Sequence, residues 1–221
     1  MPTRPSDVND RALKDKIVLA MLPDVPFEGW SRRALRHAAK RVDLTEAELS
    51  SLFPHGVRDA VAAFNDWADR ATEAALAKQR ATRLKLRERI ALGVRTRLTV
   101  LEPHREAVRR MLAFLALPAN LPLGPRLLYR TVDMLWHAAG DRSTDFSFYT
   151  KRGLLAGIYV ATTLYWLDDK SPDHAATAEF LDRRIAEVMQ IPKLRGRATA
   201  ALNRLPNPLG ALGLLARLRR A

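Results

Sequence analysis

The chain has 221 residues, of which 48% are hydrophobic and 28% are charged, so fibrous and disordered classes of protein are excluded. Lys and Arg number 37 and Asp and Glu 24, which gives a formal net charge of +13. A surplus of this size favours an anionic partner. Nucleic acid, acidic lipid head groups and an acidic protein surface all remain open, because net charge alone does not choose among them.

Cysteine is absent, which excludes disulfide bonds, thiolate metal sites and cysteine nucleophiles. The first thirty residues contain four aspartates and no apolar run of the signal-peptide type. We therefore expect a cytoplasmic protein.

Apolar residues recur at helical spacing along the whole chain, and no run alternates with the period of two that strands require. We expect an all-α fold of nine or ten helices with short links. A turn is expected at Pro26 and Gly29, and a proline-interrupted loop over 119–125. The expected helices cover about residues 13–22, 31–42, 45–53, 57–79, 83–101, 103–117, 127–140, 153–167 and 171–190.

The segment from Gly153 to Leu167 is fifteen residues long and carries no charge. It is too short to span a bilayer, which takes about twenty residues, so we expect it to be buried against other helices or a second subunit. Gly153 and Gly157 form a small-xxx-small pair that permits close approach of another helix. Ordinary core packing and a dimer seam both explain this pair.

The first sixty residues have the organisation of a helix-turn-helix unit, with a tight turn over 41–44 between the second and third helices. The alanine-rich run from Ala34 to Thr45, followed by Leu52-Phe53-Pro54, resembles the N-terminal unit of the TetR family of transcriptional repressors. That resemblance, with the positive charge, first implies a repressor that binds DNA.

The expected recognition helix argues against DNA binding. Thr45 and Glu48 have the spacing of a capping box, and the turn from Thr45 to Ser51 contains Glu46 and Glu48 but no cation. A helix in the major groove usually presents cationic, amide or hydroxyl side chains to phosphates and bases. We therefore favour a TetR-like scaffold without nucleic acid as partner. A DNA-binding repressor with an apolar ligand pocket stays the alternative, since glutamates can read the amino group of cytosine.

The stretch 139–152 carries Gly-Asp-x-Ser-Thr-Asp, then an aromatic pair and Thr-Lys-Arg. Two further motifs complete the pattern. They are Phe27-x-Gly-Trp30 and the run from Trp166 through Asp169 and Ser171-Pro172-Asp173 to Arg184. From about residue 10 to 190 the chain resembles the COQ9 family of coenzyme Q (ubiquinone) biosynthesis accessory proteins.

This resemblance implies a TetR-type fold that does not bind DNA, is usually a homodimer and binds isoprenoid lipid. Such a protein is not an enzyme and needs no cofactor. It presents a membrane-borne polyprenyl quinone precursor, or binds phospholipid, and assists the di-iron hydroxylase that acts on demethoxyubiquinone. The residues that correspond to the family's partner-facing patch are Phe148, Tyr149, Lys151 and Arg152.

A lipid pocket requires apolar side chains on the central helices. The assignment of pocket residues rests on the resemblance, since the sequence does not separate a filled core from a pocket. The candidates are Leu112, Leu115, Leu128, Met134, Leu135, Ile158, Tyr159 and Trp166. Ser143, Thr144 and Asp145 are expected to cap the next helix.

Catalytic and metal signatures are missing from the sequence. The five histidines are scattered, with no His-Glu-x-x-His or Glu-x-x-His pair, no glycine-rich phosphate loop and no Gly-x-Ser-x-Gly elbow. Asp133 and His137 lie one turn apart, but two ligands do not make a site. We expect neither catalysis nor a metal.

The tail beyond Pro192 combines leucines at helical spacing with seven cations and no carboxylate. This pattern is typical of a helix that lies in an anionic membrane surface, with its arginine stems extended toward the head groups. We expect the tail to attach the protein peripherally to the cytoplasmic face of the inner membrane. The residues expected to bind the membrane are Leu194, Leu202, Leu205, Leu209, Leu212, Leu215, Arg217, Arg219 and Arg220.

The positive charge is unevenly distributed. Residues 78–110 contain eleven cations and three carboxylates, and the sequence assigns them no partner. The chain is expected to divide into a helix-turn-helix-like unit (1–56), a lipid-binding and dimerisation region with the Ser-Thr-Asp motif (57–191) and the membrane-binding tail (192–221).

Overall fold

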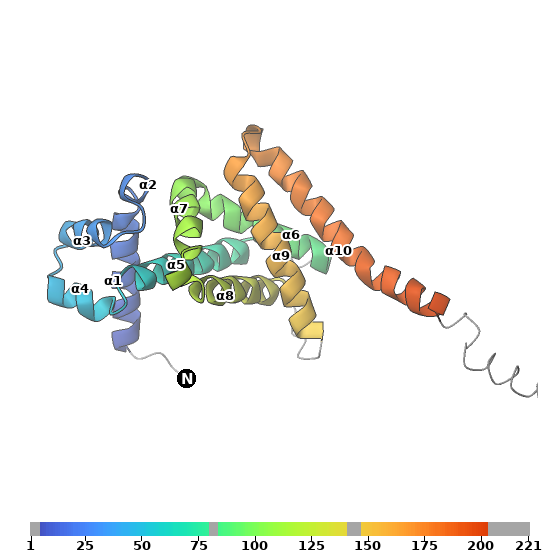
Figure 1. The fold of residues 1–221 in the computed structure, drawn as a ribbon, viewed down its shortest axis with the longest axis horizontal. Coiled ribbons are helices and arrows are strands. Elements are labelled where there is room, and N and C mark those ends of the chain that lie inside the picture. The colour runs from blue at the N-terminus through green and yellow to red at the C-terminus, as the bar shows by residue number, and fades with distance from the viewer. Residues whose placement is uncertain (1–4, 80–83, 141–146, 203–221) are drawn as a thin grey trace, which may run out of the picture. The chain divides into compact units, whose positions relative to one another are not determined.

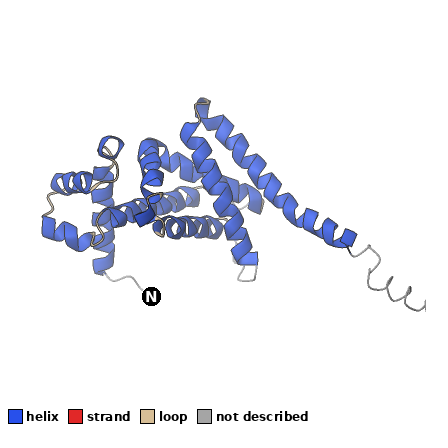
Figure 2. Ribbon diagram, in the orientation of Figure 1, coloured by secondary structure: helices blue, strands red, loops and turns tan. Residues whose placement is uncertain are grey.

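The computed structural model describes residues 5–79, 84–140 and 147–202, and it describes side chains over 9–79, 84–140 and 150–188. These ranges form helices and short connections without a strand, which confirms the all-α prediction (Figures 1 and 2). The helices are α1 (Pro5–Met21), α2 (Val25–Glu28), α3 (Arg32–Arg41), α4 (Glu46–Leu52), α5 (Val57–Ala77), α6 (Leu86–Leu101), α7 (Arg105–Leu115), α8 (Leu123–Ala138), α9 (Ser147–Asp168) and α10 (Ala175–Leu202). Within the described ranges, 3-10 turns lie at Glu102–His104, Pro118–Asn120 and Pro172–His174.

The chain divides into two compact units, residues 1–181 and 182–221, and helix α10 crosses the boundary. The predicted three-part division remains a prediction.

Within the first unit, α1 packs on α3 and α5 because the apolar stripes of these helices face one another. Ile17, Val18 and Met21 of α1 are completely buried, as are Ala34 and Ala38 of α3. The alanines allow the two helices to approach closely. The helices expected over about 13–22 and 31–42 therefore both contribute to this part of the core.

Trp30 joins the N-terminal helices to the rest of the first unit. Its Nε1 donates a hydrogen bond of 3.0 Å to the carbonyl oxygen of Ala107 on α7, and its ring centroid lies 5.3 Å from that of Phe64 on α5. Trp30 is 6% exposed, so this contact belongs to the core.

The capping box predicted at the start of α4 is confirmed. The Thr45 hydroxyl accepts a hydrogen bond from the Glu48 amide at 3.3 Å, and the Glu48 carboxylate accepts one from the Thr45 amide at 2.8 Å. Leu49 and Leu52 face the core, whereas Glu46 and Glu48 are exposed.

Helices α5, α6 and α8 pack against one another, and α9 packs on α8 and α6. The close packing of α6 on α8 depends on Gly93, since a Cβ atom there would lie 3.1 Å from Cδ2 of Leu135. Leu135 is 1% exposed and contributes to the core of this bundle.

Five predicted boundaries were wrong. Helix α1 begins at Pro5, well before the expected start near residue 13. The turn at Pro26 contains the single helical turn α2, which ends at Gly29 (φ 64°). Helix α8 begins at Leu123, inside the predicted loop, because proline is compatible with a first helical turn. Helix α9 begins at Ser147 rather than near Gly153. Helix α10 continues beyond Gln190 and through Pro192 to Leu202, since good helix formers follow the proline.

Candidate functional site

A cavity of about 470 Å³ lies at the corner between α9 and α10. One side of it is apolar and consists of Leu98, Trp166, Ala178 and Leu181, while Glu102 and His174 supply polar groups. A volume of this size and a mostly apolar lining with a few polar groups are typical of small-molecule sites.

Asp169 organises this corner by capping the chain that leads into α10. Its Oδ1 accepts hydrogen bonds from the Ser171 amide (2.8 Å) and hydroxyl (2.7 Å), and its Oδ2 accepts them from the Thr177 amide (2.9 Å) and hydroxyl (2.5 Å). Burial alone would raise the pKa of Asp169, but these four bonds outweigh it and hold the pKa well below its usual range. Asp169 and Ser171, which belong to the sequence motif, therefore have a structural role here.

Trp166 forms the wall of the cavity and is 1% exposed. Its Nε1 donates a hydrogen bond of 2.7 Å to Oε2 of Glu102, and the Arg105 guanidinium lies over its ring at 5.3 Å from the centroid. Arg105 also donates to the carbonyl oxygen of Asp169 at 2.6 Å. The tryptophan is thus fixed in position by α7 and by the turn before it.

His174 is the polar group with unused hydrogen-bonding capacity. Its Nε2 lies 2.9 Å from Oε2 of Glu102, whereas its buried Nδ1 has no hydrogen-bond partner. If Nε2 carries the proton, Nδ1 is an acceptor.

Asp173 and His174 both have positive φ values, 51° and 53°, which residues with a Cβ seldom adopt. Backbone strain of this kind concentrates at functional sites.

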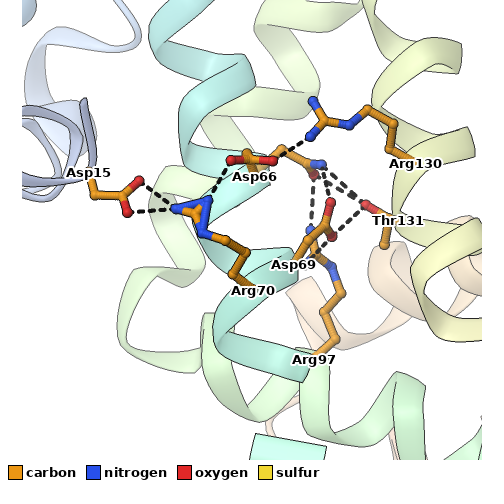
Figure 3. Close-up of polar contacts among 8 residues, drawn as sticks. Asp15, Asp66, Asp69, Arg70, Arg97, Arg130 and Thr131 are labelled. Atoms are coloured by element: carbon orange, nitrogen blue, oxygen red, sulfur yellow. Dashed lines mark hydrogen bonds and ion pairs between the residues drawn. The ribbon is translucent and has the colours of Figure 1, made fainter. Parts of the chain in front are cut away.

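A second polar cluster is buried where α5, α6, α8 and α9 meet (Figure 3). Arg97 of α6 is 1% exposed and lies 2.7 Å from Oδ1 of Asp69 on α5. Thr131 of α8 donates to the same carboxylate at 2.9 Å, and Arg97 donates to Oδ1 of Asn65 and to the Tyr159 hydroxyl, each at 2.9 Å. Burial raises the pKa of the Asp69 carboxyl, and Arg97 and Thr131 oppose this shift.

An outer layer of ion pairs adjoins this cluster, as Figure 3 shows. Arg70 contacts both oxygens of Asp15 on α1, at 2.6 and 2.7 Å, and pairs with Asp66, which also binds Arg130 of α8. These contacts join α1, α5 and α8 and fix the geometry of the cluster. Asp66 and Arg70 lie one turn apart on α5, but Asp15 and Arg130 are distant along the chain, so no local pattern indicates that these four residues meet.

The structure does not gather the predicted lipid-binding residues around one cavity. Trp166 lines the α9–α10 cavity, whereas the hydroxyl of Tyr159 belongs to the Arg97 cluster. Met134 and Ile158 are buried, and Leu135 packs against Gly93. Partly buried positions are occupied by Leu112, Leu115 and Leu128.

The predicted partner patch begins on the first turn of α9. The backbone of Phe148 and Tyr149 is helical, but their side chains lie outside the described residues. Lys151 Nζ lies 6.0 Å from the ring centroid of Trp136. Arg152 is 4% exposed and pairs with Asp133 of α8, so it already has a partner within the chain.

The outer face of α9 exposes apolar groups. Val160, Leu164 and Tyr165 are 39%, 52% and 40% exposed, and a Cβ atom added at Gly153 or Gly157 would have no atom within 4 Å. The glycine pair, which core packing or a dimer seam could explain, therefore lies on a face that no other described residue covers closely.

Other predicted residues lie outside the described part of the structure. These are the capping cluster Ser143, Thr144 and Asp145 and the tail residues Leu205, Leu209, Leu212, Leu215, Arg217, Arg219 and Arg220. The backbone of Leu194 and Leu202 is part of α10. Among the described residues, no helix is long and apolar enough to cross a membrane, and no three His, Asp or Glu side chains are placed to hold a metal ion.

The fold has a solved counterpart. A TetR transcriptional regulator from Nitrosomonas europaea superposes with a TM-score of 0.63 and 22% sequence identity, over 80% of this chain and 97% of that chain. At this identity the match shows the fold alone, so the protein has an all-α, TetR-like fold.

Sequence comparison narrows the class to one family. The COQ9 family model matches residues 121–192. Ubiquinone biosynthesis protein COQ9, mitochondrial, of Rattus norvegicus is 36% identical over 83% of this chain and 61% of its own length, and that of Homo sapiens is 34% identical over 83% and 59%. The chain belongs to the COQ9 family and spans about three fifths of the length of these relatives.

Proposed function

We propose that the protein takes part in ubiquinone biosynthesis as a lipid-binding accessory protein and not as a catalyst. In this proposal it holds a membrane-borne polyprenyl quinone precursor and presents it to the di-iron demethoxyubiquinone hydroxylase. Family membership supports the pathway, since the relatives carry ubiquinone biosynthesis in their names.

The cavity at the α9–α10 corner is the observation that carries lipid binding. Its apolar wall of Leu98, Trp166 and Leu181 suits isoprenoid carbon atoms. The unpartnered Nδ1 of His174 is placed to accept a hydrogen bond from a phenolic hydroxyl of the head group.

For the hydroxylase contact we propose the start of α9, with Phe148, Tyr149 and Lys151 as the contacting side chains. Arg152 would act there indirectly, because its guanidinium holds Asp133 and thereby fixes α9 on α8. The exposed face of Gly153, Gly157, Val160 and Leu164 supports a homodimer in which α9 packs on its symmetry mate.

We further propose that the protein is peripheral on the cytoplasmic face of the inner membrane. Seven cations and no carboxylate in 193–221, interleaved with leucines, support this attachment. Flotation with anionic liposomes tests it, and equal flotation of chains with and without 193–221 would exclude the tail as the anchor.

A DNA-binding repressor is the competing candidate, which the TetR-like fold favours. Two exposed glutamates on α4 oppose it, because each carboxylate is repelled by phosphate.

Mass spectrometry of lipid extracted from the purified protein tests the proposal. We expect a prenylated quinone precursor in the wild-type chain and much less of it in Ala178→Trp, which fills the cavity. Ala113→Trp, on the exposed side of α7, is the matched control and should retain the lipid. An empty wild-type protein that binds a specific duplex tightly would establish the repressor instead.

A further inference from the structure

A second cavity, of about 420 Å³, lies where the C-terminal ends of α5 and α8 meet the N-terminal half of α6. These three helices pack against one another. Leu76, Leu92 and Ala138 form an apolar wall, and Arg89, Glu73 and His137 supply the charged and polar groups. Gln79, Arg89 and Leu92 of its lining belong to the basic stretch 78–110, to which the proposed function gives no role.

Arg89 is the unusual group in this cavity. Within the part of the chain that the structure describes, it makes no hydrogen bond or ion pair, and its Nε is buried without a hydrogen-bond partner. Its Nη1 packs against Gly140, since a Cβ atom there would lie only 3.0 Å away. A guanidinium held in place by packing, with its donors unused, is prepared to bind an anion.

The surroundings of Arg89 are cationic and apolar at once. Lys85 lies one turn before it on the same face of the helix start, and Arg87 is exposed nearby. Leu84 and Leu86 are each 37% exposed and alternate with these cations. Glu73 is the one carboxylate among the described residues that line the cavity. Arg87 pairs with Glu88 at 3.8 Å, so the positive charge at this site comes from Arg89 in the lining and from Lys85 beside it.

We propose that this cavity binds the phosphate group of a membrane phospholipid. The planar guanidinium of Arg89 donates to two phosphate oxygens, and Lys85 adds a second positive charge. Leu84 and Leu86 contact the acyl region, as leucines beside cations do at membrane surfaces. The site shares no lining residue with the quinone cavity.

Calorimetry with dihexanoyl phosphatidylglycerol below its micellar concentration tests this site without a membrane for the tail to bind. We expect binding to the wild-type chain and at least tenfold weaker binding to Arg89→Gln. Arg36→Gln removes the same charge from an exposed position on α3 and should bind like the wild type. Ala138→Trp, which fills the cavity but leaves Arg89 in place, should also bind at least tenfold more weakly.

Unchanged affinity in both Arg89→Gln and Ala138→Trp would overturn the proposal, and thermal unfolding of each variant verifies its fold. Inorganic phosphate is the second ligand. If it binds as tightly as the lipid, the cavity is a site for free phosphate, and the assignment to a phospholipid is wrong. Retention of the quinone precursor is measured separately, so failure here leaves the proposed function intact.

Discussion

Arg152 of α9 holds Asp133 of α8 by its Nε, which donates to Oδ1 at 2.8 Å, and by its Nη2, which lies 2.7 Å from the same oxygen. The arginine is almost fully buried, and the carboxylate is partly exposed. A residue that the sequence resemblance assigns to a protein partner is therefore part of the contact between two helices of its own chain.

Arg152→Ala should lower the free energy of unfolding by about 2–4 kcal/mol, because Asp133 loses its partner and a buried volume is vacated. Urea denaturation measures this change. Lys151→Ala is the control, with an expected loss below about 1 kcal/mol since its ring contact is partly exposed. Unchanged stability of Arg152→Ala, with a large loss of affinity for the hydroxylase, would make Arg152 a direct partner contact.

Asp169→Asn should destabilise the corner between α9 and α10 by about 2 kcal/mol at pH 7, since hydrogen bonds to a charged acceptor become bonds to a neutral one. Because the folded state lowers the pKa of Asp169, its contribution is complete above the pKa of the unfolded chain, near 4. The difference between wild type and variant should therefore shrink as the pH falls below about 4. Thermal melts from pH 7 to 2.5 measure it, and a constant difference would contradict this assignment.

Arg97→Met should reduce the free energy of unfolding by about 3–5 kcal/mol, because it leaves the Asp69 carboxylate buried without its cation. The double variant Arg97→Met with Asp69→Leu should recover part of that loss. Chemical denaturation of the two single variants and the double variant gives the coupling energy. Strict additivity would show that the pair does not interact.

Gly157→Ala separates the two explanations of the glycine pair. In a monomer the substitution should stabilise α9 by up to about 1 kcal/mol, because alanine favours the helix and the added Cβ meets no atom within 4 Å. In a dimer that uses this face, the methyl group should weaken association. Sedimentation velocity and thermal unfolding over a range of protein concentrations measure both effects. A dimer of unchanged affinity would exclude this face as the interface.

Local patterns predicted much of the fold. Apolar spacing predicted a helix over 31–42, where α3 lies, and Thr45 with Glu48 predicted the start of α4, because both signals join residues within a few positions of one another. The pairs Asp69–Arg97 and Asp133–Arg152 join different helices, and no local signal indicates which charges meet. For the same reason the sequence could not separate the lipid-pocket candidates that fill the core from those that line a cavity. Trp166 lies at the cavity wall because of the way α6, α9 and α10 pack.

The hydrogen bond from Trp30 to Ala107 bears on how the chain can be shortened. Removal of residues 1–56 would expose the ring of Phe64 and leave the Ala107 carbonyl without its donor, and it would take away Asp15, which binds Arg70. The remaining helices would lose part of their own core and would not fold as the intact protein does. The N-terminal helices, which in sequence resemble a helix-turn-helix unit, therefore complete the core of the first unit.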